Sequence, residues 1–221
     1  MPSDPMQQSA LTTVSLWTVG LVLLGAMLSV HGCSPRPEPL SLLPSNAVIL
    51  AFGDSLTAGT GAEPPQSYPA QLERLTGHRV VNAGRPGELS AAGLERLPAL
   101  LDLHEPSLLI LTHGGNDLLR RMNSDQTRNN LSEMVALARA REIEVLLIAV
   151  PSPTLLRLRN EPLYGELASA LRIPIEERSL VHILSRDSLK ADPIHPNAEG
   201  YRYLAESIHQ LLLDTGALLA R

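Results

Sequence analysis

The sequence predicts an α/β fold: a three-layer sandwich in which helices cover both faces of a parallel sheet. Short apolar runs alternate along the chain with stretches of helical periodicity. The runs are apolar throughout, which is typical of strands buried on both faces. The chain has 221 residues and a hydrophobic fraction of 44%, which allow one ordinary domain with a sizeable core.

Each expected element follows from one of these two patterns. The apolar runs predict strands at residues 48–52, 79–82, 108–112, 145–150 and 173–175. The amphipathic stretches predict helices at residues 68–75, 91–104, 126–141, 163–171 and 198–213. In sheets of this kind, ligands bind beyond the carboxyl ends of the strands.

The N-terminal segment has a different character. No charged residue lies between Pro5 and Pro35, and residues 11–30 are almost wholly apolar. That length suits a membrane-spanning helix, and the segment also reads as a signal peptide. Cys33, the only cysteine, follows Gly32 directly, and this arrangement resembles the lipobox of bacterial lipoproteins. We expect an exported envelope lipoprotein anchored through Cys33, with an uncleaved membrane anchor or a cytoplasmic protein as alternatives.

Three parts of the chain follow from this pattern. Residues 1–32 are the expected signal peptide or anchor, residues 33–46 a Pro-rich tether, and residues 47–221 the folded domain. The net charge of −5 and an aromatic content of 3% argue against a nucleic-acid partner. The sequence leaves the oligomeric state open.

Reactive residue types gather where the expected strands end. Ser55 follows the first strand, Gly87 the second and Asn116 the third, while His195 precedes the last helix. A serine nucleophile needs a base, which His195 supplies, and a group that orients the base, which Asp192 supplies from three residues away. The backbone N–H groups of Ser55 and Gly87 and the side-chain amide of Asn116 are candidate oxyanion donors. Taken singly, each segment is more typical of a turn or a helix cap than of a catalytic site.

The order of these segments resembles the GDSL, or SGNH, hydrolase family over about residues 47–213. The resemblance rests on Gly53-Asp54-Ser55-Leu56, a glycine after the second strand, Gly115-Asn116-Asp117 and Asp192-Pro193-Ile194-His195. Residues 94–101 and 104–106 are similar to the thioesterase I, lysophospholipase L1 and arylesterase branch.

The resemblance implies a flavodoxin-like esterase fold and assigns the site residues. Ser55 would be the nucleophile, His195 the base and Asp192 its partner. Asn116 and Gly87 would be the oxyanion donors, with Gly84 as the alternative glycine. Two features differ from the branch: His113 stands where an apolar residue is usual, and Arg85-Pro86 precede the donor glycine.

The expected substrate is a small-molecule or lipid ester. In this branch the loops that hold Leu118, Leu119, Leu155 and Leu156 line an acyl groove, which implies acyl esters, thioesters or lysophospholipids as substrates. Ordinary core packing is the alternative role of these leucines. A carbohydrate O-acetylesterase and a non-catalytic envelope lipoprotein are the rival functions. No cofactor is expected, and no metal, because Asp192 and His195 alone are too few ligands for zinc.

Overall fold

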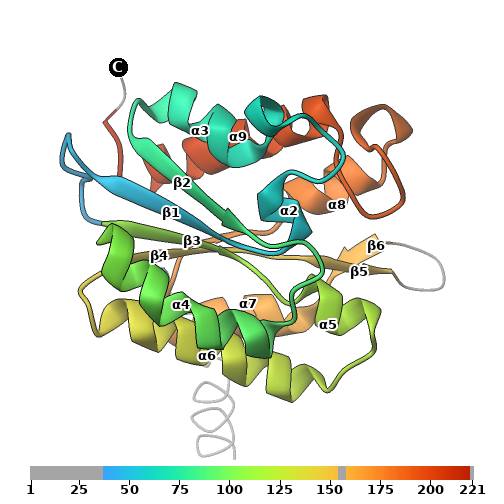
Figure 1. The fold of residues 1–221 in the computed structure, drawn as a ribbon, viewed down its shortest axis with the longest axis horizontal. Helices are drawn as coiled ribbons and strands as arrows, with labels where there is room; N and C mark the ends of the chain where they lie inside the picture. Colours follow the sequence, from blue (N-terminus) through green and yellow to red (C-terminus); the bar gives the residue numbers. More distant parts are fainter. Residues whose placement is uncertain (1–36, 154–157, 220–221) are drawn as a thin grey trace, which may run out of the picture. The chain divides into compact units, whose positions relative to one another are not determined.

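The computed structural model describes residues 37–153 and 158–219 (Figure 1). The apolar segment 11–30, Cys33, Leu155 and Leu156 lie outside the described residues. The signal peptide, the lipid anchor and the roles of these two leucines therefore stay predictions. Within the described ranges, no helix combines the length and apolar character needed to cross a membrane.

A five-stranded parallel sheet forms the centre of the domain, in the order β2-β1-β3-β4-β7. Its strands are β1 (Val48–Gly53), β2 (Arg79–Gly84), β3 (Leu108–Thr112), β4 (Glu144–Ile148) and β7 (Ile175–Glu176). The chain adds β2 on one side of β1 and then crosses to add β3 on the other side. The loops after β1 and β3 therefore diverge at a switch point, where open α/β sheets bind their ligands.

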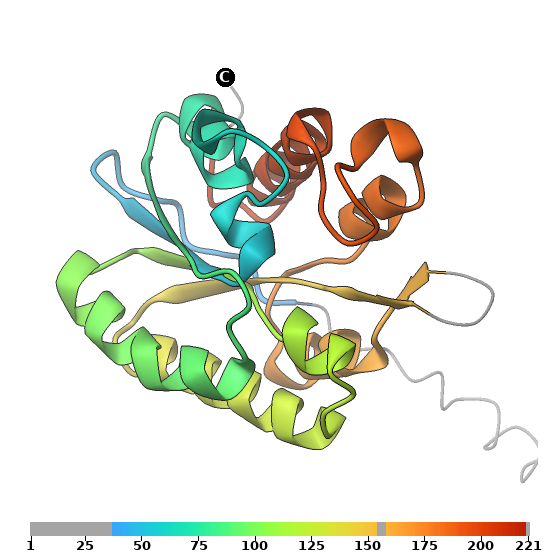
Figure 2. The same ribbon diagram turned by 45° about the vertical axis from the view of Figure 1, so that its right-hand side comes forward.

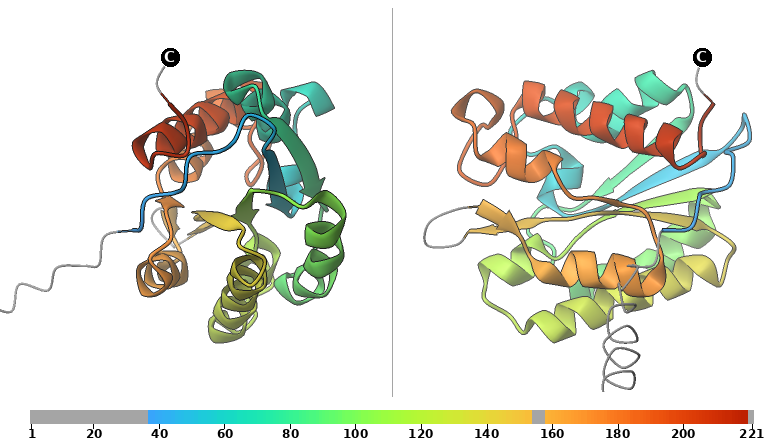
Figure 3. Two further views of the ribbon diagram at one scale, coloured as in Figure 1. Left: turned by 90° about the vertical axis from the view of Figure 1, so that its left-hand side faces the viewer. Right: turned by 180° about the vertical axis from the view of Figure 1, so that it is seen from behind.

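Helices cover both faces of this sheet, as Figures 2 and 3 show from three directions. One layer holds α3 (Tyr68–Thr76), α8 (Ser179–Leu184) and α9 (Ala198–Asp214). The other holds α4 (Ser90–His104), α6 (Ser124–Arg139) and α7 (Pro162–Leu171). The α/β sandwich expected from the sequence is confirmed, and all five strands and all five expected helices occur within a few residues of their predicted bounds.

The core lies on both sides of the sheet. Strand residues Ile49, Leu109 and Leu146 are fully buried, as are Leu97 on α4 and Leu204 on α9. Burial of a leucine or isoleucine side chain contributes about 1.5–3 kcal/mol to folding, so the two apolar interfaces hold the three layers together. The carboxyl edge of the sheet is thereby a rigid base for the loops that follow the strands.

Short elements that the sequence patterns did not predict lie mostly at this carboxyl edge. They are α2 (Ser55–Ala58), η1 (Pro64–Gln66), α5 (Gly115–Leu119), the hairpin of β5 (Pro151–Pro153) and β6 (Leu158–Asn160), α8, and η2 (Asp187–Leu189). Helices of four or five residues have too few turns to show a periodic apolar pattern. Their Gly, Asp and Ser residues read as turns in the sequence.

Residues 38–43 of the Pro-rich segment pack on the domain. Leu40 N–H donates to the Thr215 carbonyl at 2.9 Å, and Leu43 N–H donates to the Ala217 carbonyl at 3.0 Å. Leu40 and Leu43 are each 7% exposed, whereas Leu42 between them is 53% exposed. The folded unit therefore includes residues that precede Ala47.

The two neighbouring leucines give a matched test of this packing. Replacing Leu40→Ala should lower the free energy of unfolding by about 2 kcal/mol, because it leaves a cavity in a buried contact. Leu42→Ala should change it by less than about 0.5 kcal/mol, as is usual at exposed positions. Urea unfolding of both variants measures the difference. Equal, small effects would show that the segment is not part of the cooperative unit.

Candidate active site

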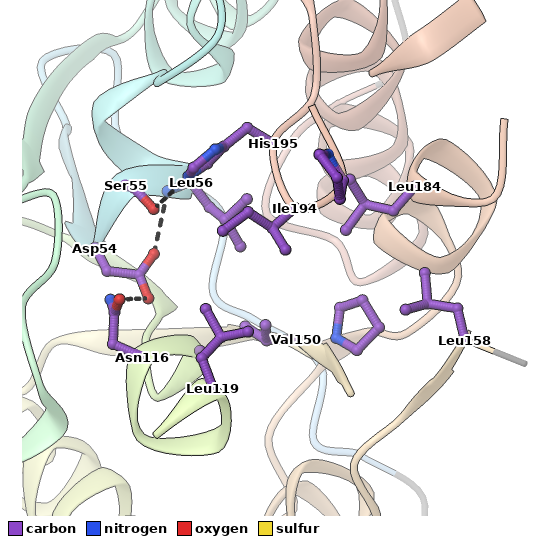
Figure 4. Close-up of a pocket in the computed structure, with 13 residues that line it drawn as sticks. Asp54, Ser55, Leu56, Asn116, Leu119, Val150, Leu158, Leu184, Ile194 and His195 are labelled. Atoms are coloured by element: carbon purple, nitrogen blue, oxygen red, sulfur yellow. Dashed lines mark hydrogen bonds between the residues drawn. The ribbon is translucent and has the colours of Figure 1, made fainter. Parts of the chain in front are cut away.

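Ser55 lies at the carboxyl end of β1, a central strand of the sheet. It is the first residue of α2, directly after β1 and Asp54. The Asp54 carboxylate caps this helix by accepting a hydrogen bond from Leu56 N–H at 3.1 Å. The cap holds the Ser55 side chain at the carboxyl edge of the sheet, where Figure 4 shows it facing His195.

His195 and Asp192 form a compact unit in the loop before α9. Asp192 Oδ1 accepts hydrogen bonds from the backbone N–H groups of Ile194 and His195, at 2.8 and 2.9 Å. Asp192 Oδ2 lies 2.7 Å from His195 Nδ1, and His195 Nε2 lies 3.0 Å from Ser55 Oγ. An ionised carboxylate only accepts hydrogen bonds, so Nδ1 carries the proton and Nε2 is free to accept from the serine hydroxyl.

Contacts between distant segments set the distance between Ser55 and His195. Gly61, after α2, has a φ of 99°, and a Cβ there would lie 2.5 Å from the Pro196 carbonyl oxygen. The absence of a side chain lets the loop after α2 approach the His195 loop closely. The Tyr201 hydroxyl on α9 donates to the Thr60 carbonyl at 2.8 Å and ties the same two segments together.

The environment of Asp192 keeps it ionised. Partial loss of hydration acts to raise its pKa, but the hydrogen bonds from the His195 ring and from two backbone N–H groups outweigh that effect. Its pKa therefore lies below the usual value for an aspartate. A carboxylate that stays charged orients a neutral imidazole and stabilises an imidazolium.

Asn116 comes from α5, on the other side of Ser55. Its Nδ2 donates to the Glu88 carbonyl at 3.0 Å and lies 3.3 Å from Asp54 Oδ2. Asp54 is only 1% exposed, and this burial raises the pKa of its carboxyl group. The side-chain amide is thus held between two segments that follow β1 and β2.

Gly87 lies in the loop after β2 with a φ of 77°, a conformation that favours glycine. It directly precedes Glu88, whose carbonyl contacts Asn116. Gly84, the alternative donor, is the last residue of β2, and its N–H already donates to Asn82 Oδ1 at 3.0 Å. The Gly84 N–H is therefore already bound to a side chain of its own strand, which makes Gly84 the less suitable oxyanion donor.

An apolar groove begins at Ser55. It encloses about 530 Å³, including space open to solvent. Figure 4 shows polar side chains at one end and apolar ones extending away from them. The apolar lining comes from separate segments and includes Leu56, Leu119, Val150, Leu158, Leu184 and Ile194.

The leucines expected to bind substrate divide into three groups. Leu119 lines the groove and is 50% exposed, while its neighbour Leu118 packs against the hydrophobic core. Leu155 and Leu156 lie outside the described residues. Leu184 and Val150 are groove residues that no motif indicated, because they reach the site only through the packing of α8 and the loop after β4.

Buried charge lies behind the Gly87 loop. The Glu88 side chain is 2% exposed and accepts from Arg96 Nε at 2.9 Å and Arg96 Nη2 at 2.6 Å. His113 Nε2 lies 3.2 Å from Glu88 Oε2. Burial acts to raise the pKa of Glu88, but the hydrogen bonds from Arg96 and His113 outweigh it, and the pKa lies below its usual value.

A second buried carboxylate fastens the start of α4 to α5. Asp117 Oδ2 accepts from Ser90 N–H at 2.9 Å, and Asp117 Oδ1 accepts from the Ser90 hydroxyl at 2.5 Å. Asn130 Nδ2 donates to the same hydroxyl oxygen at 2.8 Å. Asp117 follows Asn116 in sequence, so this contact restrains the segment that carries the amide.

The chain is similar to known proteins in both sequence and fold. Residues 51–203 match the model of the GDSL-like Lipase/Acylhydrolase family. The chain is 33% identical over 171 residues to Esterase TesA of Pseudomonas aeruginosa, covering 72% of this chain and 85% of that one. It is also 33% identical over 165 residues to Thioesterase 1/protease 1/lysophospholipase L1 of Escherichia coli K12, covering 72% and 79%. A crystal structure of TesA superposes with a TM-score of 0.69 at 32% identity, covering 76% of this chain and 99% of that one.

The fold, the groove and these relatives define the class: the chain is an enzyme that hydrolyses esters. It belongs to the GDSL-like lipase/acylhydrolase family, as the sequence motifs indicated.

The buried Glu88 carboxylate predicts how stability depends on pH. A carboxyl group whose pKa is lowered on folding contributes stability above its unfolded value, near 4.5, and loses that contribution as the pH falls through the folded value. The stability of the unchanged protein should therefore fall more steeply than that of Glu88→Gln below about pH 5. Denaturant unfolding at several pH values measures both slopes, and parallel curves would contradict the expectation.

Proposed function

We propose that the chain is a serine esterase in which Ser55 is the nucleophile, His195 the base and Asp192 its orienting partner. The observation that carries the proposal is the row of hydrogen bonds from Ser55 Oγ to His195 Nε2, at 3.0 Å, and from His195 Nδ1 to Asp192 Oδ2, at 2.7 Å. A nucleophile within reach of a base, and a base held by a third group, is the arrangement that activates a serine hydroxyl.

The reaction then proceeds in two halves. Ser55 Oγ attacks the ester carbonyl carbon while His195 Nε2 takes the hydroxyl proton, and Asp192 stabilises the resulting imidazolium. His195 returns that proton to the leaving alcohol or thiol as the bond to the acyl carbon breaks. A water molecule, deprotonated by the same nitrogen, attacks the acyl-enzyme, and the acid leaves as Ser55 regains its proton.

The negative charge on the carbonyl oxygen requires donors at the same edge. The proposed donors are the N–H groups of Ser55 and Gly87 and the side-chain amide of Asn116. Gly87 is preferred over Gly84 because the Gly84 N–H is already bound to Asn82 Oδ1. Asn116 is supported by its position on α5, next to Asp54 and against the Gly87 loop. Its two N–H bonds face Asp54 Oδ2 and the Glu88 carbonyl in the free enzyme, so donation to the oxyanion replaces the longer contact, the one with Asp54 at 3.3 Å.

The substrate class follows from the groove. Its lining is largely apolar, and it begins at the hydroxyl that receives the acyl group. Burial of each methylene in such a site contributes about 0.8 kcal/mol to binding. We propose acyl esters and acyl thioesters with chains longer than acetyl, lysophospholipids included. The proposal agrees with the relatives named esterase and thioesterase 1/lysophospholipase L1.

Removing the nucleophile tests the mechanism. Ser55→Ala should abolish hydrolysis of p-nitrophenyl esters and covalent labelling by a fluorophosphonate, because both reactions need the hydroxyl that His195 activates. The melting temperature should stay close to that of the unchanged protein, which controls for misfolding. Near-normal hydrolysis by a folded Ser55→Ala protein would remove Ser55 from the mechanism.

A chain-length series tests the acyl groove. The ratio kcat/KM should rise from p-nitrophenyl acetate to the butyrate and octanoate. Leu119→Trp places an indole at the mouth of the groove and should lower kcat/KM for octanoate by about tenfold more than for acetate. Leu103→Trp is the matched control, since Leu103 is 72% exposed on α4 and does not line the groove. Activity on acetate alone would favour an acetylesterase, and no activity on any ester would favour a binding protein.

A further inference from the structure

The proposed mechanism makes no use of the buried cluster of Glu88, Arg96 and His113. Two of these side chains are almost fully enclosed, with exposed fractions of 2% for Glu88 and 0% for His113. Burying a carboxylate is costly unless its oxygens are hydrogen-bonded, and here three donor atoms satisfy them. Such a group fixes the position of the backbone to which it is attached.

The Glu88 backbone is in contact with the proposed oxyanion site. Its carbonyl oxygen accepts the hydrogen bond from Asn116 Nδ2 at 3.0 Å, and its own N–H donates to the Arg85 carbonyl at 3.2 Å. Gly87 is the preceding residue. One peptide segment therefore carries one proposed donor and positions another, while the side chain of the same residue is held in the protein interior.

His113 connects this segment to the one that carries Asn116. Its Nδ1 accepts from the Gly114 N–H at 2.9 Å, so Nε2 bears the proton and donates to Glu88 Oε2. The His113 carbonyl accepts from the Tyr164 hydroxyl at 2.8 Å, which fixes the end of β3. The imidazole is thus a bridge between the Gly87–Glu88 loop and the Gly114–Asn116 turn.

The surroundings of the imidazole are shaped to hold it. A Cβ on Gly93 would lie 2.3 Å from His113 Nε2, so only glycine at this point of α4 leaves room for the ring. Arg96, one turn further along α4, also donates to the Ala83 carbonyl at 3.1 Å, and its guanidinium lies 4.4 Å from the centre of the Phe52 ring. The donors to Glu88 are therefore themselves fixed by β1, β2 and β3.

We propose that Glu88, held by Arg96 and His113, is a positioning residue that aligns the two oxyanion donors, Gly87 N–H and Asn116 Nδ2. The proposal rests on the proposed function, since it gives those donors their role. This positioning stabilises the transition state rather than the bound substrate, because the donors bind the substrate carbonyl oxygen most strongly as its negative charge develops. The signature is a fall in kcat with little change in KM.

Glu88→Gln and His113→Leu test the proposal. Glu88→Gln removes the charge at nearly constant volume, and His113→Leu removes the bridging donor. Each should lower kcat for p-nitrophenyl butyrate by about 10- to 100-fold, the scale of a small misplacement of catalytic groups, with KM within about twofold. His113→Gln, which keeps a side-chain donor, should recover part of the loss.

A double-mutant cycle separates positioning from a general loss of stability. In an Asn116→Ala background only the Gly87 N–H remains to be aligned, so Glu88→Gln should cost clearly less in kcat than it does when Asn116 is present. The matched control is Asp102→Asn, which removes a carboxylate that is also paired with an arginine, here Arg141 at 2.8 Å, but lies on α4 and is 65% exposed. Its kcat should stay within about twofold. Melting temperatures of all variants identify any that fail to fold, and His113→Gln then replaces the variant lost.

The outcomes are distinct. An unchanged kcat in folded Glu88→Gln, or an equal loss with and without Asn116, would overturn the positioning role. Failure of the proposed function gives a different result, because a folded Ser55→Ala protein would then retain ester hydrolysis. A coupled loss in kcat alone, partly rescued by His113→Gln, supports the proposal.

Discussion

The pairing of β1 with β2 on one side and β3 on the other is the constraint on which the site depends. These pairings are parallel, so the carboxyl ends of the three strands meet at one edge. Ser55, Gly87 and Asn116 are distant in sequence but follow those ends, so the strand pairing brings their segments to the same edge. Because β1 and β3 are almost wholly buried, their register is strongly specified, and the edge is correspondingly rigid.

Four carboxylates surround the site, and the donors around each one decide what it does. Asp192 accepts from two backbone N–H groups and an imidazole and stays ionised at the surface. Glu88 is buried but has an arginine as well as a histidine, so its charge is compensated. Asp54 is buried with a helix N–H and an amide, and its pKa is raised. Both carboxylate oxygens of Asp117 accept hydrogen bonds from Ser90 at the start of α4. Burial alone therefore does not predict the charge of a group, and the number and type of its donors must be counted.

The sequence patterns predicted the sheet and the long helices, because each leaves a signal within one continuous run of residues. They predicted the family because its short motifs follow one another in a fixed order. Short elements such as α2 and α5 left no such signal. Leu118 and Leu119 were equivalent in sequence, yet α5 points one into the core and the other into the groove. The pairing of Glu88 with His113 was also out of reach, because it depends on how closely α4 packs on β3 at Gly93. A sequence indicates which residue types are present, but their meeting in space is set by packing.

The loop that holds Asp192 and His195 is a rigid unit whose position relative to Ser55 determines whether the three residues are aligned. The hydrogen bonds between these two residues close within a span of four residues, so their mutual geometry travels with the loop. The alignment of Ser55, His195 and Asp192 then depends on one distance, the separation between this loop and the start of α2. The close approach of Gly61 to Pro196 and the hydrogen bond from Tyr201 to Thr60 restrain that separation. In the proposed mechanism, a small rigid displacement of this one loop would therefore break the hydrogen bond between His195 and Ser55 while the core of the domain remains folded.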